Sequence, residues 1–135
     1  MNTKKKSVAL AILLAFFAAA VMKLFCFDFI IVEGESMFPV IHNGTLLFVN
    51  RLAYGFRPPF SNKYLVRWAL PEKGDAVLFY TPLGDLAVKR SAGFFKGKSN
   101  SIYWTALGDN STASFDSRSY GPVSVDSIIG KAVGY

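Results

Sequence analysis

The apolar residues of the chain fall into one long stretch at the start and several short runs after it. Lysines at positions 4–6 precede the uncharged residues 7–22, and after Lys23 the apolar character continues to Phe27. As a helix rising about 1.5 Å per residue, residues 7–27 are roughly 30 Å long, which spans a bilayer core if Lys23 extends outward. The pattern predicts a single membrane-spanning helix.

A cleaved secretory signal is the alternative interpretation of this stretch. A basic start, an apolar core and the small residues at 18–20 also fit such a signal. Under both interpretations the initial lysines favour a cytoplasmic N-terminus and place the remainder of the chain outside.

After the apolar stretch, short apolar and β-branched runs alternate with Gly, Pro, Asn and Asp. They predict strands at residues 29–33, 45–51, 75–80, 85–90, 101–107 and 128–133, with residues 80–85 forming a hairpin turn. No segment there has a convincing helical period. The predicted fold class is therefore mainly β. Residues 1–28 form a cytoplasmic tip and a transmembrane anchor in the cell (inner or plasma) membrane, and residues 29–135 form a small antiparallel β domain on the extracytoplasmic side.

The charge of the chain, +6, does not indicate a nucleic-acid partner. Four of the fifteen basic residues lie in or beside the apolar stretch, and from Leu24 onward eleven basic residues face nine acidic ones. No basic patch with interleaved aromatics is present, so nucleic-acid binding is not predicted. Cys26 and His42 are the only residues of their kinds, too few for a structural zinc site, and no glycine-rich phosphate loop appears. We expect no metal and no cofactor.

Ser36, within the segment EGESMFPVIHN at residues 33–43, is the candidate nucleophile. A serine hydroxyl attacks only when a neighbouring base takes its proton. The chain offers His42, six residues on, and Lys89, which can act as a base if burial keeps its amine neutral.

Five stretches, in this order, resemble the signature boxes of bacterial type I signal peptidases: SMFP at 36–39, AYGFRPPF at 53–60, GDAVLFY at 74–80, KR at 89–90 and GDNSTASFDSRSYG at 108–121. The resemblance extends from about Ile30 to Ala132. It implies a membrane-bound serine endopeptidase that removes signal peptides from exported preproteins, with Ser36 as nucleophile and Lys89 as general base. It also favours a retained anchor, and it makes signal peptides and the lipid bilayer the expected partners.

Strand alternation bears on Lys89 and its neighbour Arg90, which must point to opposite faces. By itself, the pair is typical of two solvated cations on an edge strand. The resemblance instead directs Lys89 toward the site, where the small Ala87 on the same face leaves room.

The resemblance also implies supporting residues. Ser114 stands where the family has a serine that orients the lysine, and Asp116 and Arg118 stand where it has an ion pair. Gly34 replaces a serine that assists the oxyanion in some members, so the backbone N–H of Ser36 would be the main donor. Ile30, Val32 and Val88 are the expected walls of the substrate pocket. His42 is expected to be a loop residue, because no carboxylate is placed to orient its ring.

Two other classes remain open. A membrane-tethered β module that binds peptides without cutting them would keep the strands but would not need both Ser36 and Lys89. A Ser-Lys maturation protease with another substrate would share the two residues.

Overall fold

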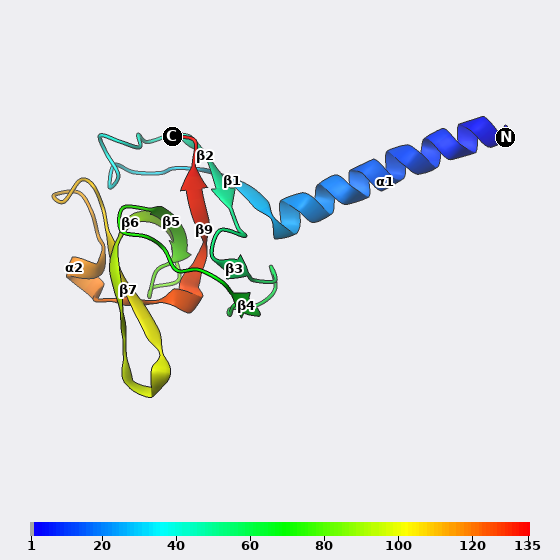
Figure 1. The fold of residues 1–135 in the computed structure, drawn as a ribbon. Coiled ribbons are helices and arrows are strands. Elements are labelled where there is room, and N and C mark those ends of the chain that lie inside the picture. The colour runs from blue at the N-terminus through cyan, green and yellow to red at the C-terminus, as the bar shows by residue number, and fades with distance from the viewer. Residues whose placement is uncertain (1) are drawn as a thin grey trace.

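The computed structural model describes residues 2–135. Helix α1 (Thr3–Phe25) extends away from the remainder of the chain, and none of its side chains is buried (Figure 1). A helix that is apolar on all its faces and buries none of its side chains against protein is suited to lipid. Its last residue, Phe25, stacks on Phe56 with ring centroids 5.8 Å apart, which connects the helix end to the β domain. The predicted N-terminal apolar helix is confirmed.

The β domain is built on a seven-stranded sheet in which neighbouring strands are antiparallel, in the order β1-β2-β9-β5-β6-β7-β8. Its strands are β1 (Phe27–Ile31), β2 (Leu46–Asn50), β5 (Ala76–Tyr80), β6 (Leu86–Lys96), β7 (Ile102–Leu107), β8 (Val123–Ser124) and β9 (Ile128–Val133). A small second sheet pairs β3 (Gly55–Phe56) with β4 (Val66–Arg67). The remaining elements are the short helices α2 (Ser117–Tyr120), η1 (Lys98–Asn100) and η2 (Val125–Ser127). The mainly antiparallel β fold is thus confirmed.

The two faces of the sheet each bury an apolar cluster, and β5 contributes to both. Leu78 packs in one cluster, whereas Val77 and Phe79 pack in the other, as strand alternation requires. The Phe79 and Trp104 rings meet edge to face, with centroids 4.8 Å apart. A strand buried on both faces gives the neighbouring β6 a rigid support.

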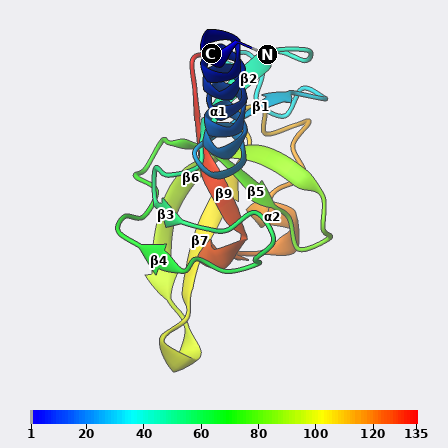
Figure 2. The ribbon, with the colours of Figure 1, turned by 90° about the vertical axis from the view of Figure 1, so that its right-hand side faces the viewer.

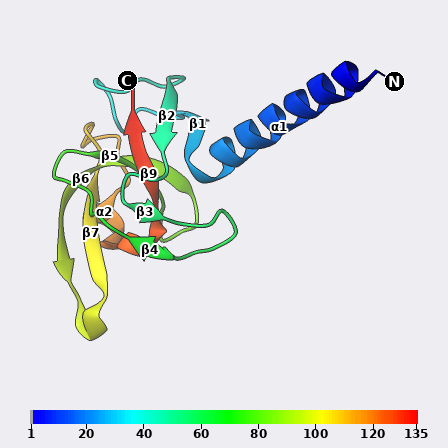
Figure 3. The same cartoon turned by 45° about the vertical axis from the view of Figure 1, so that its right-hand side comes forward.

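Among the strand edges that stay without a partner in the described residues are those of β1 and of the start of β6. β1 pairs only with β2, and β7 pairs with β6 only from Arg90 to Lys96, leaving the outer edge of residues 86–89 unpaired. The rest of β6 continues with β7 into a hairpin that projects from the sheet in all views (Figure 2 and Figure 3). The curled sheet brings β1 and the start of β6 to one cavity.

Candidate active site

Ser36 lies in a tight turn that follows β1. The next residue, Met37, and Ile41 are fully buried, and the N–H of Ile41 donates to the carbonyl of Met37 over 2.9 Å. These two apolar side chains fix the turn to the core, while Ser36 stays half-buried at its surface. The sequence therefore anchors the turn directly after Ser36 without covering its hydroxyl.

Lys89 reaches the same place from β6, where it pairs opposite Val77 of β5. It is only 5% exposed. Ser36 and Lys89 line a single cavity of about 340 Å³. Its apolar walls include Ile30, Val32 and Val88, the three residues expected to form the substrate pocket.

Burial lowers the pKa of Lys89, because an ammonium loses its hydration in apolar surroundings. The negative charge of Asp116 partly opposes this shift, whereas the positive charge of Arg118 adds to it. The amine makes no hydrogen bond to any of residues 2–135. A lysine in this state is suited to accept a proton from a nearby hydroxyl.

Asp116 organises the segment beside Lys89. Its carboxylate is fully buried and accepts hydrogen bonds from the N–H of Gly108 over 2.8 Å and from the hydroxyl of Ser114 over 2.6 Å. The guanidinium of Arg118 forms an ion pair with it. Burial by itself would raise the pKa of Asp116, but these hydrogen bonds outweigh it and hold the pKa well below its usual range. The carboxylate is thus a fixed negative charge.

The hydroxyl of Ser114 therefore donates a hydrogen bond to Asp116, and no hydrogen bond joins Ser114 to Lys89 within residues 2–135. The oxygen of this hydroxyl keeps free lone pairs, so it can still accept a hydrogen bond from an ammonium. The structure thus shows a contact of Ser114 that the resemblance did not imply.

The Asp116 segment also holds the backbone of the nucleophile turn. The N–H of Asn110 donates to the carbonyl of Ser36 over 2.9 Å. Gly108 lies so close that a Cβ there would be 2.6 Å from the same carbonyl oxygen and 2.0 Å from the Ser114 hydroxyl. A side chain at Gly108 would push the turn outward. We did not anticipate these contacts from the sequence, because they join backbone atoms more than seventy residues apart.

The backbone of the turn leaves the amide of Ser36 free for an oxyanion. Gly34 adopts a positive φ of 84°, which favours glycine, and its N–H already donates to the Asn43 side chain over 2.9 Å. The N–H of Ser36 makes no hydrogen bond within residues 2–135. The contact with Asn43 was not foreseen, since an asparagine in a turn carries no specific signal.

Arg90 points away from Lys89, as the alternation of β6 predicts. Its guanidinium binds Asp109 through two nitrogens, 3.1 and 3.2 Å from the carboxylate, and the Tyr135 hydroxyl over 2.7 Å.

His42 is exposed and packs edge to face on Phe38, outside the cavity. In residues 2–135, no group of three or more His, Cys, Asp or Glu residues is arranged to hold a metal.

Comparison with known proteins gives a consistent result. A family model described as signal peptidase, peptidase S26, matches residues 5–95 and 100–135. The chain is 27% identical to signal peptidase I of Bacillus caldolyticus over 148 aligned positions, covering 83% of this chain and 80% of that protein. It is 29% identical over 79 residues to signal peptidase I of Buchnera aphidicola subsp. Schizaphis graminum, covering 58% of this chain. Over 71 residues it is 35% identical to that of subsp. Baizongia pistaciae. These matches span only 25% and 23% of the two Buchnera proteins.

Proposed function

Because the chain belongs to the signal peptidase family, peptidase S26, we propose that it is a membrane-bound serine endopeptidase that removes signal peptides from exported preproteins. Ser36 is the nucleophile and Lys89 the general base. The observation that carries the proposal is that Ser36 and the buried Lys89 line one cavity.

The unpaired edges of β1 and of residues 86–89 suit an extended substrate. A peptide lying between them would add a strand to the sheet, with its main chain bonded to strand edges and its side chains alternating into pockets. The cavity walls Ile30, Val32 and Val88 are apolar, so we expect apolar residues just before the cleaved bond. The resemblance to signal peptidases implies that the first and third residues before the cut are small.

The proposed reaction uses the two residues that line the cavity. The Ser36 Oγ attacks the scissile carbonyl while its proton passes to Lys89 Nζ, and the N–H of Ser36 stabilises the oxyanion. When the C–N bond breaks, Lys89 returns the proton to the leaving amine. Water, deprotonated by Lys89, then attacks the ester on Ser36. As the bond between the acyl carbon and Oγ breaks, Lys89 returns the proton to Ser36 Oγ. Asp116, through Ser114, Gly108 and Arg118, holds the surrounding segment in place.

Incubation of the detergent-solubilised protein with a preprotein tests this function. We expect one cut at the end of the signal peptide, located by the mass of the products, and no cut with Ser36→Ala. A preprotein that binds but stays intact would favour a peptide-binding module. Cleavage confined to other sites would favour a maturation protease.

Helix α1 serves as a retained anchor with its N-terminus in the cytoplasm and the β domain outside. The initial lysines support this orientation, and the Phe25–Phe56 stack places the helix end against the β domain. We expect N-terminal sequencing of membrane-extracted protein to begin ahead of α1. A mature start at about Val21 would contradict the anchor.

His42 is expected to be dispensable. Its ring is exposed and lies outside the cavity of Ser36 and Lys89. His42→Ala should keep kcat/KM for preprotein cleavage within a few-fold of the parent. Loss of turnover in a folded His42→Ala protein would show that the base is wrongly assigned.

A further inference from the structure

A second cavity continues the substrate groove toward the membrane anchor. It has a volume of about 200 Å³ and shares Leu78 and Leu86 with the cavity of Ser36 and Lys89. Its other walls include Asp28, near the start of β1, and Tyr80, at the end of β5. The N–H of Arg51, another wall residue, donates to the carbonyl of Cys26, which directly follows α1. The cavity therefore lies on the anchor side of the groove.

The position along β6 determines which part of a substrate would reach this cavity. Leu86 precedes Lys89 by three residues, roughly 10 Å along a strand. A peptide that runs parallel to β6, with its last residue before the cut at Lys89, has its fourth residue before the cut near Leu86. The residues that precede it, about the fifth to the seventh, would enter the second cavity.

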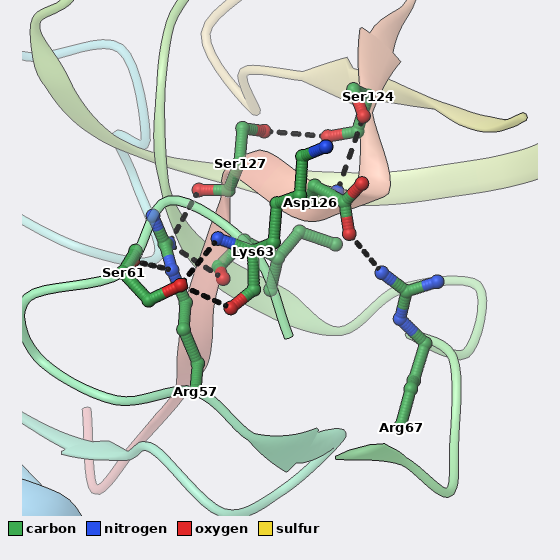
Figure 4. Close-up of polar contacts among 8 residues, drawn as sticks. Arg57, Ser61, Lys63, Arg67, Ser124, Asp126 and Ser127 are labelled. Atoms are coloured by element: carbon green, nitrogen blue, oxygen red, sulfur yellow. Dashed lines mark hydrogen bonds and ion pairs between the residues drawn. The ribbon is translucent and has the colours of Figure 1, made fainter. Parts of the chain in front are cut away.

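Two arginines give this cavity an excess of positive charge. Arg57 is 7% exposed and has no carboxylate within ion-pair distance in residues 2–135. Its Nε donates to the carbonyl of Ser61 and its Nη1 to that of Ile128, each over 3.0 Å, so the guanidinium is fixed between a loop and β9 (Figure 4). Its Nη2 makes no hydrogen bond in the described residues.

The second arginine, Arg51, is also incompletely paired. Its Nη1 lies 3.4 Å from the carboxylate of Asp28, the only acidic side chain in the cavity wall, while its Nε is buried without a partner. The Nη2 atoms of Arg57 and Arg51 have no partner in residues 2–135, so the two arginines of the cavity wall offer donors to acceptors from outside the chain.

We propose that this cavity binds the main-chain carbonyls at the end of the substrate's membrane helix, with Arg57 and Arg51 as donors. The inference rests on the proposed function. An apolar segment in lipid must be helical to satisfy its backbone, yet its last four carbonyls have no partner within the helix and carry a partial negative charge. Arginine donors fixed at that point match them, whatever the side chains of the substrate.

Two peptide substrates test the inference. The short one has four residues before the cut, and the long one adds an apolar helical segment ending six residues before the cut. For each enzyme the readout is the ratio of kcat/KM for the long peptide to that for the short one, in neutral detergent. We expect Arg57→Met to lower this ratio at least about tenfold, the size of a charge-assisted hydrogen bond.

Two further variants separate binding from folding. Arg57→Lys, which keeps the cation, covers the case in which Arg57→Met does not fold, and it should lower the ratio less than Arg57→Met. Arg67→Met is the matched control, because Arg67 pairs with Asp126 in the same region but does not line the cavity (Figure 4). Its ratio should stay that of the parent.

The other outcomes overturn the inference. Equal losses on both peptides with Arg57→Met and Arg57→Lys would mean that Arg57 only supports the fold. An effect on both peptides that appears only when phosphatidylglycerol is added would mean that a lipid phosphate occupies the cavity. If the unmodified protein cleaves both peptides and the Arg57 variants keep its ratio of kcat/KM values, this inference alone is refuted. If the unmodified protein cleaves neither peptide, the proposed function is refuted as well.

Discussion

Lys89→Arg is expected to abolish cleavage, with kcat/KM falling by roughly 10³-fold or more, as far as for Ser36→Ala. Lys89 can act as a base only as a neutral amine, and burial lowers its pKa in the direction that provides one. Arginine keeps the approximate size and the charge of a protonated lysine. Its guanidinium stays charged in proteins, however, and cannot become a neutral base. Single-turnover cleavage of a preprotein measures the loss.

The adjacent residue supplies the matched control. Arg90→Lys keeps a cation that can reach Asp109 but loses the two-nitrogen contact, so it should only weaken the enzyme. Thermal unfolding of both variants shows whether they are folded. An active Lys89→Arg protein would show that Lys89 is a bystander.

The pH profile of the unmodified protein should show the ionisation of the Lys89 amine. The fraction of neutral amine rises with pH through the lowered pKa, so kcat/KM should rise in a single step centred below the ordinary lysine value of about 10.4. A profile centred at or above that value would contradict a desolvated base.

The parts of the fold that were predictable are those specified by local pattern. Apolar continuity identified α1, and alternation identified the long strands, including the opposite directions of Lys89 and Arg90. The two-residue strands β3, β4 and β8 were missed because two residues carry no alternation. The strand predicted to end at residue 90 continues to Lys96 as β6, across an irregular register between Ser91 and Phe94 that interrupts the pattern.

The candidate site divides in the same way. Ser36 and Lys89 could be proposed from short motifs, and Ile30, Val32 and Val88 from the resemblance that those motifs carry. The motifs did not show which groups form hydrogen bonds with each other. Asn43 accepts from the Gly34 amide, the Asn110 amide donates to the Ser36 carbonyl, and Asp116 accepts from the Ser114 hydroxyl. Each is a contact of a polar side chain or a backbone amide, and such groups occur in every loop. Only the tertiary arrangement selects which of them meet.

Asp116→Ala is expected to cause a large loss of stability together with the loss of activity. The buried N–H of Gly108 would lose its acceptor, which costs about 1–3 kcal/mol, and Arg118 and Ser114 would lose theirs as well. Because Gly108 and Asn110 contact the carbonyl of Ser36, the nucleophile turn should shift too. Urea unfolding at pH 7 gives the change in unfolding free energy, and cleavage of a preprotein gives the activity.

The pH dependence of the difference in unfolding free energy between the unmodified protein and Asp116→Ala shows whether this difference comes from the carboxylate charge. The pKa of Asp116 is depressed in the folded state relative to about 3.9 in an unfolded chain. The carboxylate therefore stabilises the fold fully above that value, and the stabilisation is lost as pH falls through the folded-state pKa. The stability gap between the parent and Asp116→Ala should thus narrow below about pH 4.

Asp116→Asn separates the charge of this residue from its shape. The amide oxygen can still accept from Gly108, so this variant should be more stable than Asp116→Ala. Because the Asp116 charge raises the pKa of Lys89 and Arg118 lowers it, removing that charge alone should shift the rise of kcat/KM to lower pH. An Asp116→Asn profile that rises at the same pH as the parent would show that the carboxylate acts on the fold and has no electrostatic effect on Lys89.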